Sequence, residues 1–407
     1  MKNSPRPRPL SIHLVAAEES GDALGGALAG ALLDREAGAL KLAGVGGRAM
    51  AARGIPSPFP IAELSIVGLT AIPRRLPKIL RRIRETADAV VAAQPDALVI
   101  IDSPDFTHRV ARLVRRRAPT IPILDYVSPS VWAWRPGRAR AMRTYVDCVL
   151  AILPFEPAVY VRLGGPACLY VGHPLLERIA ELRPNANEAH RRVADPPLVL
   201  VLPGSRTSEI RRLLTIFGEA LARVGDRAGP LELVLPTLPQ LAPQIREGVA
   251  GWPVPPRILV EPAEKWAAFR TARAALAASG TVTLELALSG VPTVAAYRVP
   301  LVEEVVLRLM IERPRPHSMI LANLAVGENI MPEFLQRDCI ADRLADSLLP
   351  LLSDTPERQR QVEGFRRLDQ IMALDVAPSA KAAAVVIEVA RRGRRDPTAL
   401  AANLGKC

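Results

Sequence analysis

The sequence predicts an α/β protein built from two Rossmann-like, doubly wound domains that face a cleft, followed by a helical C-terminus. Three observations lead to this fold class. Short apolar runs alternate with helical patterns, and turns rich in Gly, Pro and Ser separate them. Continuous apolar strands joined by helices are typical of parallel sheets covered on both faces. The 407 residues, 49% of them apolar, suffice for two domains with full cores.

The expected strands recur along both halves of the chain. In the first half they are IHLVAA (12–17), LAGVGG (42–47), ALVIID (97–102), IPILDYV (121–127), CVLAIL (148–153) and CLYVG (168–172). In the second half they are LVLVLPGS (198–205), LELVLPT (231–237), RILVEP (257–262), AALAAS (274–279) and PTVAAY (292–297). This spacing favours two parallel sheets.

The domain boundaries follow from the segments that interrupt this alternation. A polar, proline-flanked stretch at 175–197 is a linker candidate between an N-terminal domain (1–174) and a C-terminal sheet domain (198–340). Helices are expected over 341–392, before a polar tail at 393–407. Ligands of such sheets bind at the carboxyl ends of the strands. The polar residues at strand ends are therefore the candidate site residues.

An acidic loop follows the first strand. The run 12–17 leads into Glu18, Glu19 and Ser20, without the G-x-G-x-x-G pattern of dinucleotide-binding loops, so NAD binding is not favoured. The alternative is a tight turn in which Ser20 or Asp22 caps the next helix.

A second acidic loop follows the run ALVIID. Asp102 ends this run, and Asp105 opens the following helix just after Pro104. Two carboxylates on one strand-end loop are candidates for a general base. Asp102 taken alone is also a typical helix N-cap. The pair does not form an Asp-x-Asp motif, so a metal-held sugar nucleotide is not favoured.

Two small-residue loops in the second half are candidates for phosphate binding. In LPGSR (202–206), glycine permits close backbone approach and the helix start offers free amides. Arg206 can also form two hydrogen bonds to one phosphate.

The second of these loops is ASGTVTLE (278–285). Here Ser279, Gly280 and Thr281 could present amides and hydroxyls to a diphosphate. Glu285 lies one turn after Thr281 and could accept hydrogen bonds from a ribose diol. The alternative is that Glu285 is a buried carboxylate that caps its own helix.

A cationic amphipathic segment at 64–85 is a candidate membrane contact. Apolar residues recur at steps of three and four between basic side chains, a pattern typical of a helix in an anionic bilayer surface. The expected contact residues are Ile66, Val67, Leu69, Ile72, Leu76, Ile79 and Leu80. A nucleic-acid-binding helix looks similar but does not need the apolar loop SIVGL before it. The other alternative is a helix whose apolar stripe packs on the protein core.

The loop candidate DYVSPSVWAWRPGRARAM (125–142) holds two of the four tryptophans. In an extended chain Trp132 and Trp134 would point the same way and present aromatic surfaces to the cleft. The arginines that would meet a phosphate or lipid headgroups are Arg135, Arg138 and Arg140. The alternative is that both tryptophans lock a long loop onto the sheet.

Charge and composition narrow the function classes. The net charge of +12 favours an anionic partner, whether nucleic acid, phosphorylated substrate or anionic lipid. The four cysteines lack metal or redox spacing, as expected in a reducing cytosol. The N-terminus lacks the apolar core of a signal peptide. The apolar segment 274–297 is interrupted by Glu285 and glycines, so we expect strand, helix and strand there rather than a membrane span.

Taken in order, these motifs closely resemble those of one family, the lipid-A-disaccharide synthases, glycosyltransferases of GT-B type from bacteria with an outer membrane. The resemblance covers residues 11 to 390 approximately and rests on VAAEESGD, GVGGRAM, IDSPDF, YVSPSVWAWR, LPFE, VGHPL, LPGSR, ASGTVTLE, YRV and LANLAVGENIMPEFLQ. SPSVWAWR is its most specific motif. Two departures are small, because Ala17 in place of the usual Gly and Leu-Ala-Asn in place of Leu-Pro-Asn remove no chemical group.

The resemblance implies that 2,3-diacylglucosamine passes from UDP-2,3-diacylglucosamine to the 6-hydroxyl of 2,3-diacylglucosamine 1-phosphate, with inversion and release of UDP. It implies Asp105 as the general base, with Asp102 or Glu18 orienting the acceptor or sharing this task. The implied UDP contacts are Arg206, Ser279, Gly280, Thr281, Glu285 and Asn323. The residues expected at the acceptor or elsewhere in the cleft are Ser20, Trp132, Trp134, Arg135, Glu328 and Gln336. No cofactor or metal is needed if helix ends and Arg206 neutralise the leaving group.

Other functions stay open at this point. The same fold hosts other UDP-sugar transferases and hydrolysing 2-epimerases, and a non-catalytic binder of anionic lipid would also use the positive charge. We expect a cytoplasmic protein that associates peripherally with the anionic surface of the inner membrane and binds no nucleic acid. A homodimer is also considered.

Overall fold

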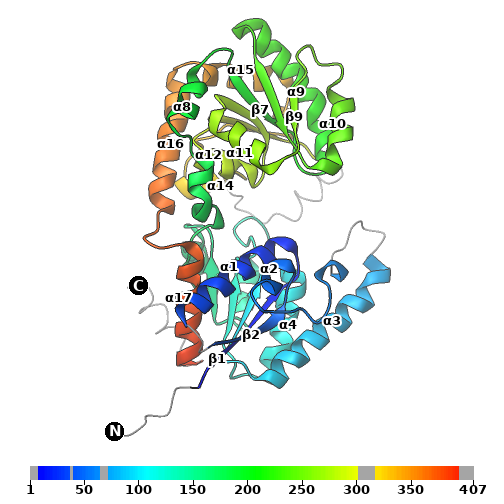
Figure 1. Cartoon of the computed structure of the whole chain (residues 1–407), viewed down its shortest axis with the longest axis vertical. Helices are drawn as coiled ribbons and strands as arrows, with labels where there is room; N and C mark the ends of the chain where they lie inside the picture. Colours follow the sequence, from blue (N-terminus) through cyan, green and yellow to red (C-terminus); the bar gives the residue numbers. More distant parts are fainter. Residues whose placement is uncertain (1–7, 37–39, 65–71, 301–316, 394–407) are drawn as a thin grey trace. The chain divides into compact units, whose positions relative to one another are not determined.

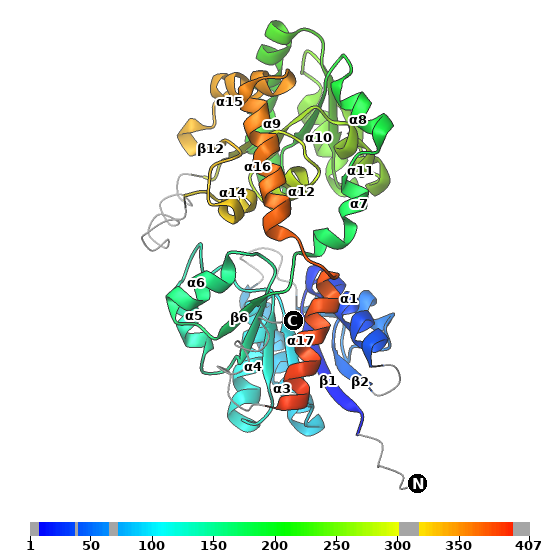
Figure 2. The ribbon, with the colours of Figure 1, turned by 90° about the vertical axis from the view of Figure 1, so that its left-hand side faces the viewer.

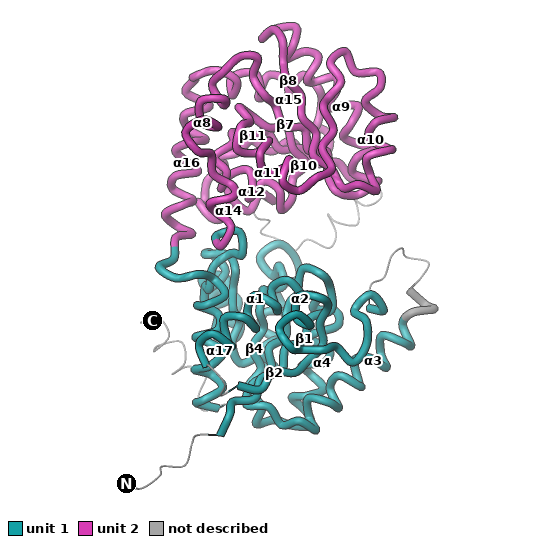
Figure 3. The backbone as a smooth tube through the Cα atoms, viewed as in Figure 1, with its two compact units in different colours: residues 1–176, 374–407 teal, residues 177–373 magenta. Residues whose placement is uncertain are grey.

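The computed structural model of the chain describes residues 8–36, 40–64, 72–300 and 317–393. It divides into two compact units (Figure 3). Unit 1 comprises residues 1–176 and 374–407, and unit 2 comprises residues 177–373. Each unit contains a six-stranded sheet in which the paired strands run parallel. The predicted class, α/β with two doubly wound sheets and C-terminal helices, is confirmed.

In the sheet of unit 1, the order of the strands reverses next to the first strand of the chain. Its order is β2 (Leu40–Val45), β1 (Leu10–Ala16), β3 (Ala97–Ile101), β4 (Ile123–Tyr126), β5 (Cys148–Ala151) and β6 (Ala167–Tyr170). Strand β1 pairs with β2 on one side and β3 on the other. The loops after β1 and β3 therefore diverge to opposite faces and leave a crevice at this switch point.

Helices cover both faces of the unit 1 sheet (Figures 1 and 2). Leu14 points to the core shared with α1 (Glu19–Arg35) and α17 (Pro378–Arg392). The next residue, Val15, points to the opposite core, as the two-residue period of a strand requires. That core is completed by α3 (Ile72–Ala93), α4 (Pro104–Arg117), α5 (Gly137–Met142) and α6 (Glu156–Leu163).

The C-terminal helices do not form a segment of their own over 341–392, which corrects the predicted boundaries. Helices α15 (Ala341–Leu348) and α16 (Pro356–Met372) belong to unit 2, whereas the chain returns to unit 1 at Leu374. Helix α17 packs against α1 because its apolar face, including Ala382 and Val386, completes the core under β1. The expectation of helices over 341–392 did not indicate which sheet each helix covers.

The sheet of unit 2 has the strand order of dinucleotide-binding folds. It runs β12 (Glu333–Leu335), β11 (Thr293–Tyr297), β10 (Ala274–Ala278), β7 (Leu198–Leu202), β8 (Glu232–Pro236) and β9 (Arg257–Leu259). The order reverses between β7 and β10, which pair directly. Strand β12 was not predicted, because three residues are too few to show an apolar period.

The helices of unit 2 fall into two groups. Helices α9 (Thr207–Ala228), α10 (Ala242–Val249) and α15 share one core with β7 and β10. Helices α11 (Pro262–Thr271) and α12 (Val282–Leu288) also contact these strands, and α8 (Ala186–Val193), α14 (Leu321–Val326) and α16 pack against that pair. The segment 274–297 is thus strand, helix and strand, as expected. Among the described residues no helix is long and apolar enough to span a bilayer.

The expected linker at 175–197 is folded onto unit 2, a second correction. It contains η3 (Pro174–Arg178), α7 (Ile179–Leu182) and α8. Arg192, at the end of α8, donates hydrogen bonds to backbone carbonyls that end α11 and α12. Carbonyl groups at helix ends lack intrahelical partners, so this guanidinium fixes the segment in place. Polar composition alone did not distinguish such anchoring from a free tether.

Candidate active site

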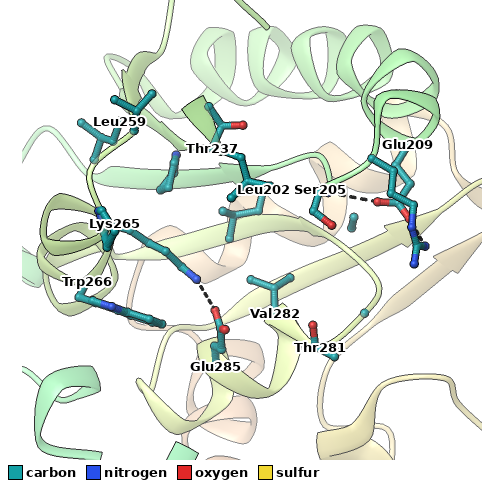
Figure 4. Close-up of a pocket in the computed structure, with 18 of the residues that line it drawn as sticks. Leu202, Ser205, Glu209, Thr237, Leu259, Lys265, Trp266, Thr281, Val282 and Glu285 are labelled. Carbon is teal, nitrogen blue, oxygen red and sulfur yellow. Dashed lines mark hydrogen bonds and ion pairs between the residues drawn. The ribbon is translucent and has the colours of Figure 1, made fainter. Parts of the chain in front are cut away.

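A cavity of about 660 Å³ lies at the switch point of unit 2. The loops after β7, β8, β9 and β10 line it, together with the first turn of α11 (Figure 4). This volume falls within the range of pockets that hold small organic ligands, about 300–1,000 Å³. Of the predicted UDP contacts, Arg206, Ser279, Gly280, Thr281 and Glu285 line the cavity.

The loop after β7 is shaped by a glycine and an ion pair. Gly204 has φ +112°, and a Cβ there would lie 2.5 Å from Oε2 of Glu209, so only glycine fits without strain. Glu209 accepts hydrogen bonds from the Ser205 amide (3.2 Å) and from Nη1 of Arg206 (3.0 Å). The Arg206 side chain is nevertheless 75% exposed. Its guanidinium thus stands beside the start of the long helix α9, where positive charge favours anions.

The loop after β10 presents backbone amides. The amides of Gly280 and Thr281 donate no hydrogen bond to any residue that the structure describes. Ser279 is held differently, because its hydroxyl donates to Oε1 of Glu333 (2.6 Å). Glu333, on β12, also accepts from the Ser318 hydroxyl (2.9 Å). Ser279 thus fixes the loop, and its neighbours provide the free donors.

Glu285 does not cap its own helix. Its Oε2 lies 2.8 Å from Nζ of Lys265 on α11, and Figure 4 shows this pair on one side of the cavity. Nζ of Lys265 also lies 4.2 Å from the ring centroid of Trp266. Nearby, the hydroxyl of Thr237 is buried without a hydrogen-bond partner among the described residues. The cavity therefore offers a paired carboxylate, an aromatic face and an unsatisfied hydroxyl.

In unit 1 the predicted acidic residues gather at the switch point between β1 and β3. The Ser20 hydroxyl donates to Oδ2 of Asp102 (3.1 Å), and the Ser103 amide donates to its Oδ1 (2.7 Å). Asp102 and Ser103 both have positive φ, 53° and 44°. Two consecutive left-handed residues other than glycine are strained, and such strain concentrates at functional sites. Asp105 is exposed in the first turn of α4, and Glu18 is exposed before α1.

The helix-cap alternatives do not hold for these acidic residues. The N-cap of α4 is Ser103 rather than Asp102, and it makes no side-chain cap bond. Neither Ser20 nor Asp22 caps α1, whose N-cap is Glu18. The Asp22 carboxylate instead accepts the amides that begin the short helix α2 (Arg48–Ala51), from Gly47, Ala49 and Met50 at 2.6–3.0 Å.

A second, smaller cavity of about 260 Å³ opens beside Asp105. Arg135 lines it, so the structure brings together the predicted base and one predicted acceptor residue. Three further arginines of unit 1 share the cavity: Arg109, Arg112 and Arg138. Arg140 does not line it and is exposed.

Comparison with known proteins identifies the family. A family model described as lipid-A-disaccharide synthetase matches residues 12–387. The lipid-A-disaccharide synthase of Bradyrhizobium diazoefficiens is 59% identical over 385 residues, which cover 94% of this chain and 97% of that protein. The chain belongs to the lipid-A-disaccharide synthetase family.

Solved structures of distant proteins share the fold of this family member. MurG of Acinetobacter baumannii matches with a TM-score of 0.55 and 17% identity, over 93% of this chain and 100% of that chain. The glycotransferase of kitacinnamycin matches with a TM-score of 0.59 and 16% identity, over 94% of this chain and 99% of that chain. At these identities the likeness concerns the GT-B fold alone.

The tryptophans of the family's SPSVWAWR motif point in different directions, contrary to the extended conformation we predicted. The amides of Ala133 and Trp134 both donate to the carbonyl of Ser130, so the chain turns here. Trp132 packs edge-on against Phe155 and joins the core, as expected of a loop lock. Trp134 is 40% exposed.

Three further predicted residues lie away from the unit 2 cavity. Asn323 is fully buried, and its amide bonds the Met331 backbone in both directions at 2.9 Å. Glu328 forms a two-point ion pair with Arg367 at 2.8 and 2.9 Å, beside a separate cavity. The amide of Gln336 bonds the Val299 backbone at 2.7 and 3.3 Å. All three fix loops, a role that the motif alone did not reveal.

The amphipathic segment divides along its length. Ile66, Val67 and Leu69 lie outside the described residues, as does the side chain of Ile72. Ile79 and Leu80 pack against the unit 1 core, so this part of the stripe is structural. Leu76 is 41% exposed and remains the described candidate for membrane contact.

Sequence reasoning missed several residues of both cavities. Lys265 and Trp266, on α11, and Thr237, after β8, belong to segments with no recognisable motif, and only the fold brings them to Glu285. Arg109 and Arg112 did leave a signal, because they follow Asp105 by four and seven residues on one helix face.

Proposed function

We propose that this chain transfers 2,3-diacylglucosamine from UDP-2,3-diacylglucosamine to the 6-hydroxyl of 2,3-diacylglucosamine 1-phosphate. The products are a β-1,6-linked disaccharide 1-phosphate and UDP. Family membership over nearly the whole chain supports the reaction. The observation that carries it is the unit 2 cavity, where a guanidinium, free amides and a carboxylate line a switch point.

The donor nucleotide binds in unit 2. Its diphosphate is held by Arg206 and by the free amides of Gly280 and Thr281. These donors stabilise the negative charge that develops on UDP as it leaves. Glu285 accepts hydrogen bonds from the ribose hydroxyls, and its ion pair with Lys265 orients the carboxylate. Because these groups supply the positive charge, the proposed step uses no metal and no cofactor.

The acceptor binds in unit 1 with its 6-hydroxyl at Asp105. Asp105 takes the hydroxyl proton while the oxygen attacks the anomeric carbon and the bond to the UDP oxygen breaks. A single displacement inverts this carbon, and the proton passes from Asp105 to solvent. Asp102 is less suited as the base because Ser20 and Ser103 already donate to its oxygens. It positions the loop, whereas Glu18 and Ser20 orient the acceptor.

Both substrates carry acyl chains, so the enzyme acts at the anionic inner surface of the inner membrane. Helix α3 is suited to this contact, because Leu76 is exposed near its start and Arg81 and Arg84 are exposed further along. Leu76→Ser should weaken sedimentation with phosphatidylglycerol vesicles. Leu33→Ser, at a similarly exposed leucine of α1, is the matched control. Equal sedimentation of both variants with the unchanged chain would exclude this contact.

The reaction is tested by incubating the chain with donor and acceptor, with and without EDTA, and weighing the products by mass spectrometry. The proposal expects the disaccharide 1-phosphate and UDP in equal amounts, at the same rate with the chelator. Release of UDP without the acceptor, or an epimerised sugar, would instead favour a hydrolysing epimerase. Loss of turnover in EDTA would contradict the metal-free step.

A further inference from the structure

The small cavity beside Asp105 carries an excess of positive charge. Four guanidinium groups line it, from Arg109, Arg112, Arg135 and Arg138, against the single exposed carboxylate of Asp105. Within the part of the chain that the structure describes, none of the four forms an ion pair. On the same helix α4, by contrast, Arg115 pairs with Asp147 and Arg117 with Asp88. Arg116 of α4 also has no ion pair among the described residues and lies outside the cavity, so what distinguishes the cavity is that four unpaired arginines gather there.

A buried network holds one of these arginines in place. Nη2 of Arg112 donates to the Tyr145 hydroxyl (3.0 Å), and its guanidinium carbon lies 4.6 Å from the centroid of that ring. The same hydroxyl lies 3.1 Å from Nδ1 of His108, which lines the cavity and is 2% exposed. Nε2 of His108 lies 3.1 Å from Oδ2 of buried Asp125. Nδ1 of His108 thus faces the Tyr145 hydroxyl and Nε2 faces the Asp125 carboxylate, which favours a positioning role for this residue.

Aromatic packing orients two more of the arginines. The guanidinium carbon of Arg135 lies 4.5 Å from the ring centroid of Trp134, and that of Arg138 lies 5.9 Å from it. A guanidinium that stacks by its face keeps its N–H edges available. Such edges match the oxygens of a phosphate, which they bind two at a time. Exposed Trp134 therefore stacks with Arg135 and Arg138 and orients their guanidinium groups.

We propose that this cavity is a phosphate-monoester site that binds the phosphate of the sugar acceptor next to Asp105. The inference rests on the proposed function for the identity of the acceptor. The volume, about 260 Å³, lies below the usual range for whole organic ligands and suits a phosphate with part of one sugar. Four guanidiniums match a dianionic monoester better than the singly charged diester of a phospholipid headgroup. The site selects acceptors that carry the phosphate.

The test is calorimetric titration of the full chain with glucosamine 1-phosphate and with glucosamine. The unchanged chain should bind the phosphate ester and not the free sugar. Arg109→Gln with Arg138→Gln should raise the Kd for the ester roughly 10- to 100-fold, since two charge-assisted contacts are lost. The Kd for UDP should stay unchanged. Both side chains are solvent-accessible, and circular dichroism melting checks that the variant is folded.

A matched double variant controls for net charge. Arg116→Gln with Arg143→Gln removes the same charge from α4 and from the residue that ends α5, outside the cavity. Its Kd for the ester should stay within about twofold, because exposed distant charges are screened. Equal weakening by both double variants would overturn the site, as would equal binding of glucosamine by the unchanged chain.

Two further measurements separate the sources of phosphate and the two proposals. If the double variant Arg109→Gln with Arg138→Gln binds phosphatidylglycerol vesicles more weakly but binds the sugar phosphate as before, the cavity binds lipid headgroups and the acceptor site is refuted. If the unchanged chain lacks transferase turnover but binds the ester through these arginines, only the proposed function fails. If turnover is normal and the acceptor KM is unchanged in the variant, only the phosphate site fails.

Discussion

The two units share a sheet architecture, but the charges that line their cavities are arranged in opposite ways. In unit 2 the cations of the cavity are paired, Arg206 with Glu209 and Lys265 with Glu285. In unit 1 the described arginines beside Asp105 have no carboxylate partner. A common fold thus leaves the choice of ligand to loop residues. Paired charges suit a nucleotide with both hydroxyls and phosphates, whereas unpaired ones suit an anion that brings its own charge.

The backbones of the two sites differ in the same sense. Unit 2 uses glycine where its loop needs a positive φ, at Gly204. Unit 1 places Asp102 and Ser103 in the left-handed region, where a side chain costs free energy. The unit 2 loop is therefore relaxed, and the unit 1 loop that precedes Asp105 is strained. We infer that function, rather than stability, fixes the unit 1 loop.

The largest effect should come from Asp105→Ala. The account predicts that kcat falls about 100-fold or more because proton removal from the acceptor is lost. The Kd for UDP should stay the same, since the nucleotide cavity belongs to unit 2. Steady-state kinetics and UDP titration measure the two quantities. Near-normal turnover would assign the proton transfer to another group and remove the chemical contrast between the units.

A pH effect on stability should arise in unit 1, from Glu156. Burial raises the pKa of Glu156 to about 7, from an ordinary value near 4.5. The folded state therefore favours the protonated acid, so its contribution is full below pH 4.5 and is lost as pH rises to 7. The difference is about 3 kcal/mol.

Glu156→Gln should remove that pH dependence. The contribution of Glu156 is the difference in urea midpoint between the variant and the unchanged chain, measured across pH. Hydrogen exchange in β5 and α6 then locates this contribution in unit 1. This difference cancels other groups such as His173, whose pKa burial lowers to about 4, with the opposite slope. Parallel pH curves for both chains would contradict the assignment to Glu156.

A smaller effect on binding should come from Glu285→Gln. The amide keeps the shape of the side chain but loses the negative charge that pairs with Lys265. It is also a weaker acceptor for the ribose hydroxyls, so the Kd for UDP should rise about 10-fold. Acceptor binding should not change. Glu264→Gln, on the exposed first turn of α11, is the control. If both variants bind UDP like the unchanged chain, the ribose lies elsewhere.

The smallest effect tests the strain in unit 1. Ser103→Gly should stabilise the chain by about 0.5–1 kcal/mol, because glycine adopts the left-handed conformation without a clash. The loop becomes looser, so turnover should fall while thermal stability rises. Ser103→Ala removes the same unpartnered hydroxyl but keeps the strain. Equal melting temperatures for the glycine and alanine variants would show that the loop is not strained.

The sequence predicted the framework and the strand-end residues better than their partners. All eleven predicted strands are present within three residues of their expected ends, because buried parallel strands read as continuous apolar runs. Arg206, Gly280 and Glu285 share one cavity for the same reason, since they follow neighbouring strands.

The rest depended on contacts between distant segments. The partners Lys265 and Glu333 become visible only once α11 and β12 are in place. Asn323 lies in a family motif, yet its side-chain amide forms hydrogen bonds with the backbone of its own loop. Trp132 and Trp134 separate because Ser130 starts a turn, which apolar spacing does not report. Motifs thus indicated which residues matter, and packing decided what each one does.

A crystal structure of the full chain with UDP tests the central claim most directly. The account predicts the diphosphate against Arg206 and the amides of Gly280 and Thr281, the ribose at Glu285, and the unit 1 arginines unoccupied by nucleotide. UDP seated among Arg109, Arg112 and Arg138, or bridged to the protein by a divalent ion, would contradict it.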